Sequence, residues 1–321
     1  MRKQNSKQMF ENSKTEAVRE ALAKSIARWT ANAEHIETAI PGLALWQRKE
    51  PTQPMSGMYE PSICLAVQGA KRVVLGDDVY VYDAQHFLIT SVDLPTVWQI
   101  VEASEEKPCL GLVLKLDQRE IAQLLADSHL PPPRVRESRR GMAIGEVTLP
   151  LLTAFERLIG LLDEAEDIPI LAPIIQREIH YRLLVGDQGE RLRQIVTVKN
   201  PSHQIAKAIE WLKSHYDQPL RIEDLAARVH MSASAFYHHF RRLTAMSPLQ
   251  YQKWLRLNEA RRLMLTEGFN AATAAFRVGY GSPSQFSREY RRFFNKPPAK
   301  DIMSLRRMPG SARGYHSNQF A

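Results

Sequence analysis

The sequence predicts an α+β protein of two domains: an N-terminal β-sandwich or barrel with flanking helices, and a C-terminal all-α domain with two helix-turn-helix units. Three observations predict it. Short apolar runs fill residues 42–115, the last third contains an internal repeat, and an excess of basic charge is confined to that third. A length of 321 residues is enough for two domains with separate hydrophobic cores.

The repeat relates SASAFYHHFRRLT (232–244) to SPSQFSREYRRFF (282–294), fifty residues apart. In each copy two aromatic residues are four positions apart, so both lie on one face of a helix. Ser, Tyr, His and Arg fill the opposite face. A repeat at a fixed spacing indicates one structural unit used twice.

A second helical pattern precedes each copy, IEDLAARV (222–229) and AATAAFRV (271–278). A short turn follows each, and then Ser232 or Ser282 can cap the next helix. This order is that of a helix-turn-helix. Amphipathic helix pairs also occur in proteins that never touch DNA. Two in tandem, with matching Arg pairs, favour a protein that reads nucleic acid.

The charge is unevenly distributed. Residues 201–307 contain 18 Lys and Arg against 8 Asp and Glu, although the whole chain has a net charge of only +8. The first 200 residues are therefore mildly acidic. A basic domain joined to an acidic one is typical of a nucleic-acid reader attached to something else.

In the N-terminal part of the chain, the sequence predicts a set of strands with helices before and after them. Residues 13–37 have apolar residues at helical spacing, and 42–115 contain short apolar or alternating runs separated by Gly, Pro and Asp turns. Three further helices are expected at about 117–128, 149–163 and 170–184, the first capped by Asp117. Several strands with turns every eight to twelve residues indicate a sandwich or barrel.

The motif FRVGYGSPSQFSREYRRFFNKPP (276–298) resembles the C-terminal signature of the AraC/XylS family of bacterial transcription regulators, and MSPLQYQKWLRLNEARRLM (246–264) resembles that family's linker helix. Two positions depart from the family pattern, because Gly281 replaces a common acidic residue and Asn295 a common Gly. Asn can adopt the left-handed conformation that Gly supplies.

YEPSICLAVQGAKRVVLGDDVYVYD (59–83) and FLITSVDLP (87–95) resemble the N-terminal domain of one AraC subfamily. The resemblance implies a cupin-like β jelly roll that senses a small molecule. The expected first domain, residues 1–190, is a cupin-like sensor and dimerisation domain with flanking helices. A linker at 191–203 joins it to an AraC-type double helix-turn-helix at 204–307, and a flexible tail follows at 308–321.

Reading helices place a few side chains at base edges while others fix the phosphates. By the family pattern Ser234, Tyr237 and His238 match base-contacting positions. On the second helix Arg288 suits guanine and Gln285 suits adenine. The full set of expected DNA-binding residues is Ser234, Tyr237, His238, Arg241, Arg242, Pro283, Ser284, Gln285, Ser287, Arg288, Arg291 and Arg292.

An effector pocket requires side chains on the inner face of the barrel. Alternation puts Ile63 and Leu65 on one face of their strand and Cys64 and Gln68 on the other, but does not say which face is inside. The candidate effector-binding residues are Tyr59, Cys64, Gln68, Phe87 and Trp98, with core packing as the alternative for each. Cys64 could be a reactive thiol, or an inert one if buried.

No enzyme is expected. Between residues 46 and 116 the only histidine is His86, too few for a metal-dependent cupin, and no phosphate-binding or Ser-His-Asp pattern occurs. We therefore expect no cofactor and no metal. No apolar run is long enough to span a membrane, the N-terminus lacks the apolar core of a signal peptide, and two cysteines fit a reducing compartment. A cytoplasmic location is expected.

The sequence thus predicts a sequence-specific DNA-binding regulator, expected to be an activator, with promoter DNA, RNA polymerase and an unknown small-molecule effector as partners. The apolar stripe of helix 170–184 is either core or, as in the family, a homodimer interface. The alternative function is a ligand-independent architectural DNA binder that uses its barrel only to dimerise.

Overall fold

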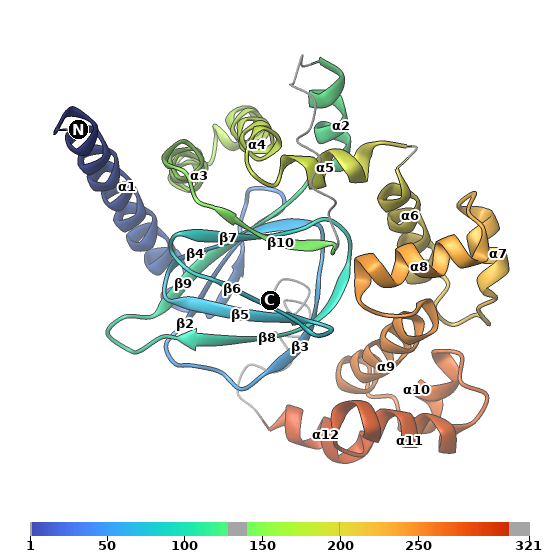
Figure 1. Ribbon diagram of the computed structural model, residues 1–321. Coiled ribbons are helices and arrows are strands. Elements are labelled where there is room, and N and C mark those ends of the chain that lie inside the picture. Colours follow the sequence, from blue (N-terminus) through green and yellow to red (C-terminus); the bar gives the residue numbers. More distant parts are fainter. Residues whose placement is uncertain (1, 128–139, 199, 308–321) are drawn as a thin grey trace. The chain divides into compact units, whose positions relative to one another are not determined.

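The computed structural model describes residues 2–127, 140–198 and 200–307. The chain divides into two compact units, one reaching to His203 and the other starting at Gln204 (Figure 1). The expected tail at 308–321 lies outside the described residues.

The first unit is built on two antiparallel sheets, which confirms the predicted fold class. The six-stranded sheet has the order β1-β2-β9-β4-β7-β10 and the four-stranded sheet the order β3-β8-β5-β6 (Figure 1). The strands are β1 (His35–Glu37), β2 (Leu43–Arg48), β3 (Met55–Tyr59), β4 (Ser62–Gln68), β5 (Ala70–Leu75), β6 (Asp78–Tyr82), β7 (His86–Thr90), β8 (Leu94–Glu102), β9 (Cys109–Lys115) and β10 (Met142–Glu146).

Helices cover the six-stranded sheet on one side. Helix α1 packs against β2, β4 and β9, and also against α3. The helices of this unit are α1 (Arg2–Trp29), α2 (Gln118–Asp127), α3 (Leu149–Gly160), a 3-10 turn at Leu161–Asp163, α4 (Ile168–Val185) and α5 (Gly189–Val196). The expected cap at Asp117 is present, because its carboxylate accepts the backbone N–H of Arg119 at 2.8 Å.

The structure differs from two expectations for this unit. The helix expected at 13–37 begins at Arg2 and ends at Trp29, and His35–Glu37 is instead a strand paired with β2. Periodicity missed this strand because its three residues are too few to show an alternating pattern. Within the segment expected to be a linker, 191–203, residues 191–196 belong to α5, where Leu192 and Ile195 are buried on one helical face, and α6 begins at Pro201.

Seven helices lie between Pro201 and Arg306, where every residue is described: α6 (Pro201–Ser214), α7 (Ile222–Arg228), α8 (Ala233–Thr244), α9 (Pro248–Thr266), α10 (Ala271–Arg277), α11 (Pro283–Phe294) and α12 (Pro298–Arg306). Helices α7 and α8 form one helix-turn-helix, and α10 and α11 form the other. The long helix expected between the two is α9.

The turns of the two helix-turn-helix units have the same key conformation but different lengths. His230 (φ 55°) and Gly279 (φ 84°) are each the second residue after the first helix of their unit. A Cβ on Gly279 would lie 1.9 Å from the Asp217 carbonyl oxygen, so only glycine fits. The second turn is one residue longer. Asn295, at φ 56°, has the left-handed conformation expected of it.

Each helix-turn-helix buries its repeated aromatic pair. Phe236, Phe240, Phe286 and Tyr290 are fully buried, with ring centroids 5.5 Å apart in the first pair and 5.4 Å in the second. In the second helix-turn-helix Tyr290 donates to the buried Asp301 at 2.7 Å, and Arg261 donates two hydrogen bonds to the same carboxylate. The carboxylate is therefore buried with its charge paired.

Arg256 on α9 joins the two halves of this domain. Its guanidinium donates to the carbonyls of Tyr216 (2.6 Å), Asp217 (3.1 Å) and Gln218 (2.9 Å), which precede the first helix-turn-helix. It also donates to the Gly279 carbonyl (3.1 Å) in the turn of the second. One side chain thus holds a segment from each half against the long helix.

We expect Arg256→Ala to lower the free energy of unfolding of the second unit by about 2–4 kcal/mol, because four carbonyls lose a charged donor. Urea denaturation followed by far-ultraviolet circular dichroism measures this in the full chain. Arg277→Ala, at an exposed position of α10, is the control and should change the stability by less than about 0.5 kcal/mol. Equal stability of the two variants would contradict the role assigned to Arg256.

Candidate nucleic-acid interface and candidate effector site

Helix α8 presents a polar face. The hydroxyl of Ser232 accepts the backbone N–H of Ala235 at 3.3 Å and caps the helix. On this face Ser234, Tyr237, His238 and Arg241 are exposed and Arg242 is half-buried. This helix therefore offers hydroxyl and imidazole groups to solvent, the kinds of group that read base edges.

Helix α11 repeats the arrangement with more charge. Ser282 accepts the backbone N–H of Gln285 at 3.4 Å, so the cap survives beside the exposed Gly281. Pro283 is the first helical residue, as expected. The remaining members of the expected set on this helix are Ser284, Gln285, Ser287, Arg288, Arg291 and Arg292, and none of them is buried.

A small polar cluster holds one of these side chains. Glu289 accepts a hydrogen bond from Gln285 at 3.2 Å and one from Tyr280 at 3.0 Å, and it pairs with Lys253 of α9 at 3.2 Å. These partners lower the pKa of Glu289. Gln285 is therefore oriented before any ligand binds. Within the described part of the chain, Arg288 makes no hydrogen bond or ion pair.

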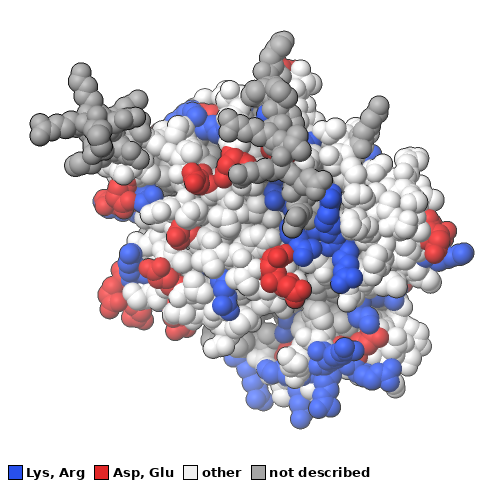
Figure 2. All heavy atoms as spheres, in the orientation of Figure 1, with Lys and Arg blue, Asp and Glu red and all other residues white. Residues whose placement is uncertain are grey.

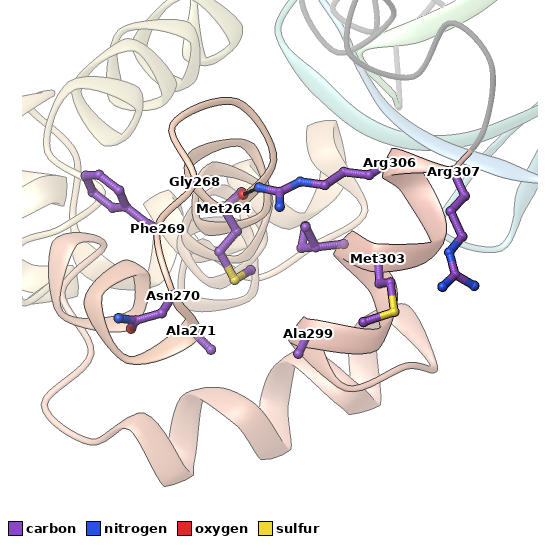
Figure 3. Close-up of a pocket in the computed structure, with 10 residues that line it drawn as sticks. Met264, Gly268, Phe269, Asn270, Ala271, Ala299, Met303, Arg306 and Arg307 are labelled. Carbon is purple, nitrogen blue, oxygen red and sulfur yellow. Dashed lines mark hydrogen bonds between the residues drawn. The ribbon is translucent and has the colours of Figure 1, made fainter.

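Basic side chains predominate on the visible face of the second unit. Figure 2 shows Lys and Arg gathered over its lower helices, with few acidic side chains among them. The second unit also contains a hollow of about 440 Å³, lined by the end of α9, the start of α10 and α12 (Figure 3). Arg306 donates to the Met264 carbonyl at its edge, and the hollow includes none of the residues expected to read DNA.

Strand register identifies the inner face of the sandwich. Trp46, Gly111 and Ala66 lie opposite one another across β2, β9 and β4. Cys64 lies two residues from Ala66 on the same side of β4. Trp46 faces Lys71 of the other sheet, with the ammonium 5.2 Å from the ring centroid. The Cys64 side of β4 is therefore inside.

The structure brings three of the five expected effector residues together. Tyr59, Cys64 and Trp98 surround Lys71, whose ammonium is 5.4 Å from the Tyr59 ring and 4.2 Å from the Trp98 ring. Phe87 does not join them, because it lies opposite Leu65 on the outer side of the sheet. Gln68 lies at one end of the sandwich, near α1, and donates to the Pro108 carbonyl at 2.6 Å.

Lys71 is the residue that the sequence did not single out. It is 3% exposed, and burial lowers its pKa to about 7. The indole N–H groups of Trp46 and Trp98 beside it are buried without a hydrogen-bond partner. An available signal was the alternation in KRVVL, where Lys71 shares a face with Val73 and Leu75, both buried.

The thiols do not favour the reactive-cysteine hypothesis. Burial raises the pKa of Cys64 to about 11 and that of Cys109 to about 12, which keeps both protonated at neutral pH. Across the residues that the structure describes, no group of three His, Cys, Asp or Glu side chains could hold a metal ion.

Comparison with known proteins agrees with this geometry. Residues 39–191 match the family model of the AraC-type transcriptional regulator N-terminus, and residues 225–301 match a helix-turn-helix domain. The chain belongs to the AraC/XylS family. Members of this family are transcription regulators that bind DNA through helix-turn-helix units, and the sequence resemblance is thereby confirmed.

Curated relatives of this AraC-family chain include the transcriptional activator RhaS from strains of Salmonella. RhaS of Salmonella typhimurium is 28% identical over 153 residues, which is 47% of this chain and 54% of RhaS. The chain thus spans about half the length of the curated relatives it matches.

Solved structures of ToxT from Vibrio cholerae share the fold over most of the chain. The form with bound unsaturated fatty acid has a TM-score of 0.51 at 12% identity, covering 85% of this chain and 96% of ToxT. An apo form of a ToxT variant has a TM-score of 0.52 at 11% identity, covering 83% and 99%. Among the helices of the described residues, none combines the length and the apolar character that a membrane span requires.

Removing the buried ammonium should stabilise the protein. We expect Lys71→Met to raise the free energy of unfolding at pH 7, because an apolar side chain of similar length replaces a buried charge with no counterion. Above a pH of about 7 the folded chain has released this proton, while the unfolded chain keeps it up to the ordinary lysine pKa of 10.5. Wild-type stability should therefore rise relative to Lys71→Met by at most about 1.4 kcal/mol per pH unit.

Urea denaturation of both proteins between neutral and alkaline pH measures this difference. The other groups electrostatically coupled to Lys71 are His35, Arg48, Cys64 and Cys109. Burial lowers the pKa of His35 below its usual 6.5, so this imidazole has lost its proton before the alkaline range is reached, and neither thiol titrates in the folded chain below its raised pKa. A stability difference that stays constant with pH would mean that the Lys71 pKa is not lowered.

Proposed function

We propose that the protein is a sequence-specific transcription regulator, an activator, that reads promoter DNA with helices α8 and α11. The observation that carries this proposal is the pair of capped helices with exposed polar faces, both packed on the domain core through buried aromatic residues. Arg288 supports it most directly, since a guanidinium without a protein partner among the described residues is available for a bidentate pair with guanine. The relatives named as activators support the direction of regulation.

The first unit is the sensor in this proposal. The buried cluster around Lys71 supports this role, because a lysine ammonium is costly to bury and contributes little to stability. A buried lysine therefore suits ligand binding better than it suits the packing of a core. A ToxT structure with bound unsaturated fatty acid supports ligand binding in this fold. The effector would act by preferring one conformational state of the chain over another. Activation would then follow from contact with RNA polymerase.

Dimerisation through α4 is the third part of the proposal. Ile175, Ile179 and Leu183 of its apolar stripe are buried in the unit, which supports the core interpretation for half of the stripe. The other half is exposed. Ile170 is 68% and Ile174 58% exposed, and further exposed apolar residues of this helix are Leu171, Tyr181 and Val185. A self-complementary apolar face suits a two-fold interface between copies.

A ligand-independent architectural DNA binder remains the second candidate. The same exposed face of α4 favours it, because dimerisation alone would give a protein with two basic domains. Retention of genomic fragments by the purified protein at near-physiological salt separates the two functions. A few sites with two motifs about one helical turn apart support the regulator, and diffuse retention supports the architectural binder.

We expect Arg288→Ala to cost about 1–3 kcal/mol on the preferred site and to relax the preference at one base position. Arg292→Ala is the matched comparison. If Arg292 touches phosphate, its loss weakens binding to all sequences and reduces the salt dependence by about one ion. Fluorescence anisotropy with single-base variants of the site measures both. A uniform loss for Arg288→Ala would instead assign Arg288 to a phosphate.

We expect Ile174→Arg to convert a dimer to a monomer, because two guanidinium groups would meet in an apolar interface. Sedimentation velocity measures the oligomeric state. Val79→Arg is the control, since Val79 is 59% exposed on β6 and is not part of α4. A dimer that survives Ile174→Arg but not Val79→Arg would assign the interface to the four-stranded sheet.

A further inference from the structure

Lys71 is a buried cation with no anion near it. Across the described residues its ammonium makes no ion pair and no hydrogen bond, although it is 3% exposed. The groups around it, by contact, strand pairing or electrostatic coupling, are His35 of β1, Trp46 and Arg48 of β2, Tyr59 of β3, Cys64 of β4, Tyr82 of β6, Trp98 of β8 and Cys109 of β9. Arg48 is itself paired with Glu34 at 2.9 Å.

None of these groups supplies negative charge. Burial raises the pKa of both thiols and of the Tyr59 and Tyr82 phenols, so all four are uncharged at neutral pH. The three aromatic faces around the ammonium attract it through cation–π interaction. When Lys71 is protonated, the cluster therefore holds a positive charge that no described protein group neutralises.

The ring edges give a second, independent observation. The indole N–H groups of Trp46 and Trp98 are buried without an acceptor. A buried donor that lacks an acceptor costs about 1–3 kcal/mol, so two beside one unpaired ammonium are unusual. The hydroxyls of Tyr59 and Tyr82 are also buried without a partner, and each can donate or accept. None of these groups is an anion, so what the cluster lacks is a charged acceptor.

A carboxylate meets both needs. It carries one negative charge, and its two oxygens provide about four acceptor positions. The residues around the cluster suit an apolar remainder, because Ala44 and Ala66 are small inward-facing residues of the six-stranded sheet, and Val73 and Trp98 face inward from the other sheet. Lys71, Trp46 and Trp98 are thus the residues that discriminate between candidate ligands.

We infer that the interior of the sandwich binds the carboxylate of a small monocarboxylic acid with an apolar body, with Lys71 as the ionic partner. This inference rests on the proposed sensing role of the first unit and names the chemical class of its effector. Neutral polar ligands would leave the ammonium unpaired. They therefore bind less tightly than the acid, because they offer the ammonium no opposite charge.

The test uses the full chain with a panel of monocarboxylates, the even-numbered straight-chain acids from acetate to stearate together with benzoate and phenylacetate. Each is matched by its primary amide, which keeps the shape and removes the charge. Melting temperature and tryptophan fluorescence report binding. We expect at least one acid to bind at least about tenfold more tightly than its amide, a difference that corresponds to one lost charged contact.

Two variants of neighbouring residues locate the site. Lys71→Met should reduce the affinity for that acid by about tenfold or more. Arg72→Met should leave the affinity unchanged, because Arg72 is exposed on the outer face of the same strand and donates to Gln99 at 2.7 Å. If Lys71→Met is less stable than expected, its melting curve without ligand reveals this, and isothermal titration below that temperature still measures binding.

Three results would overturn the inference: no acid binds, an amide binds as well as its acid, or Lys71→Met keeps full affinity. A fourth concerns carbonyl chemistry. The matching aldehydes can form an imine with the Lys71 amine, and borohydride reduction fixes that imine as a stable amine. If the aldehydes are fixed on Lys71 in this way while no acid binds, the site binds carbonyl compounds and the carboxylate assignment fails.

Measuring how well the same protein preparations retain DNA shows whether a failure concerns this inference or the proposed function. Selective DNA binding without binding of any acid leaves the regulator standing and removes the carboxylate site. Binding of an acid that leaves DNA affinity unchanged keeps the site and removes its proposed regulatory role.

Discussion

The double helix-turn-helix depends on one guanidinium. Arg256 donates to three carbonyls before the first helix-turn-helix and to one in the turn of the second, and Gln252 on the preceding turn of α9 donates to two of the same carbonyls. A rigid planar group with five donors can satisfy several carbonyls at once, which a lysine cannot do in this geometry. The separation between α8 and α11, and hence the spacing of any bases they read, is set by this contact and by the length of α9.

The sequence reveals the second unit far better than the first. Its signals are local: Ser232 and Ser282 as caps, aromatic residues four apart, and Asn295 at a left-handed position all act within one or two helical turns. The strand at His35–Glu37 has too few residues to show alternation, although it pairs with the next strand along the chain. Helix α5 has apolar residues at helical spacing, Leu192 and Ile195, but only eight residues in which to show the pattern. Likewise, the alternation of residues along a strand separates its two faces but does not say which one is inside. The pairing of Trp46, Gly111 and Ala66 supplies that information.

The candidate sites follow the same division. Positions on α8 and α11 could be assigned from helical periodicity alone, because exposure follows from the place on the helix. The cluster around Lys71 could not, since its members come from strands spread along the chain from β2 to β9. Tyr59, Cys64 and Trp98 are conspicuous in the sequence because aromatic and thiol side chains stand out within strands, and the structure places them around Lys71. Lys71 was missed because a lysine within a strand is ordinarily a solvent-facing residue.

The turn of the second helix-turn-helix has one residue more than that of the first, and this has a consequence for modularity. From the caps onward the two copies correspond position by position, so the contact residues of α8 and α11 can be exchanged as short grafts without altering any loop. Exchange of whole units would change the angle at which one helix leaves its turn, and would bring His230 to the place where Gly279 touches Asp217. The recombinable element in this protein is therefore the single reading helix rather than the helix-turn-helix.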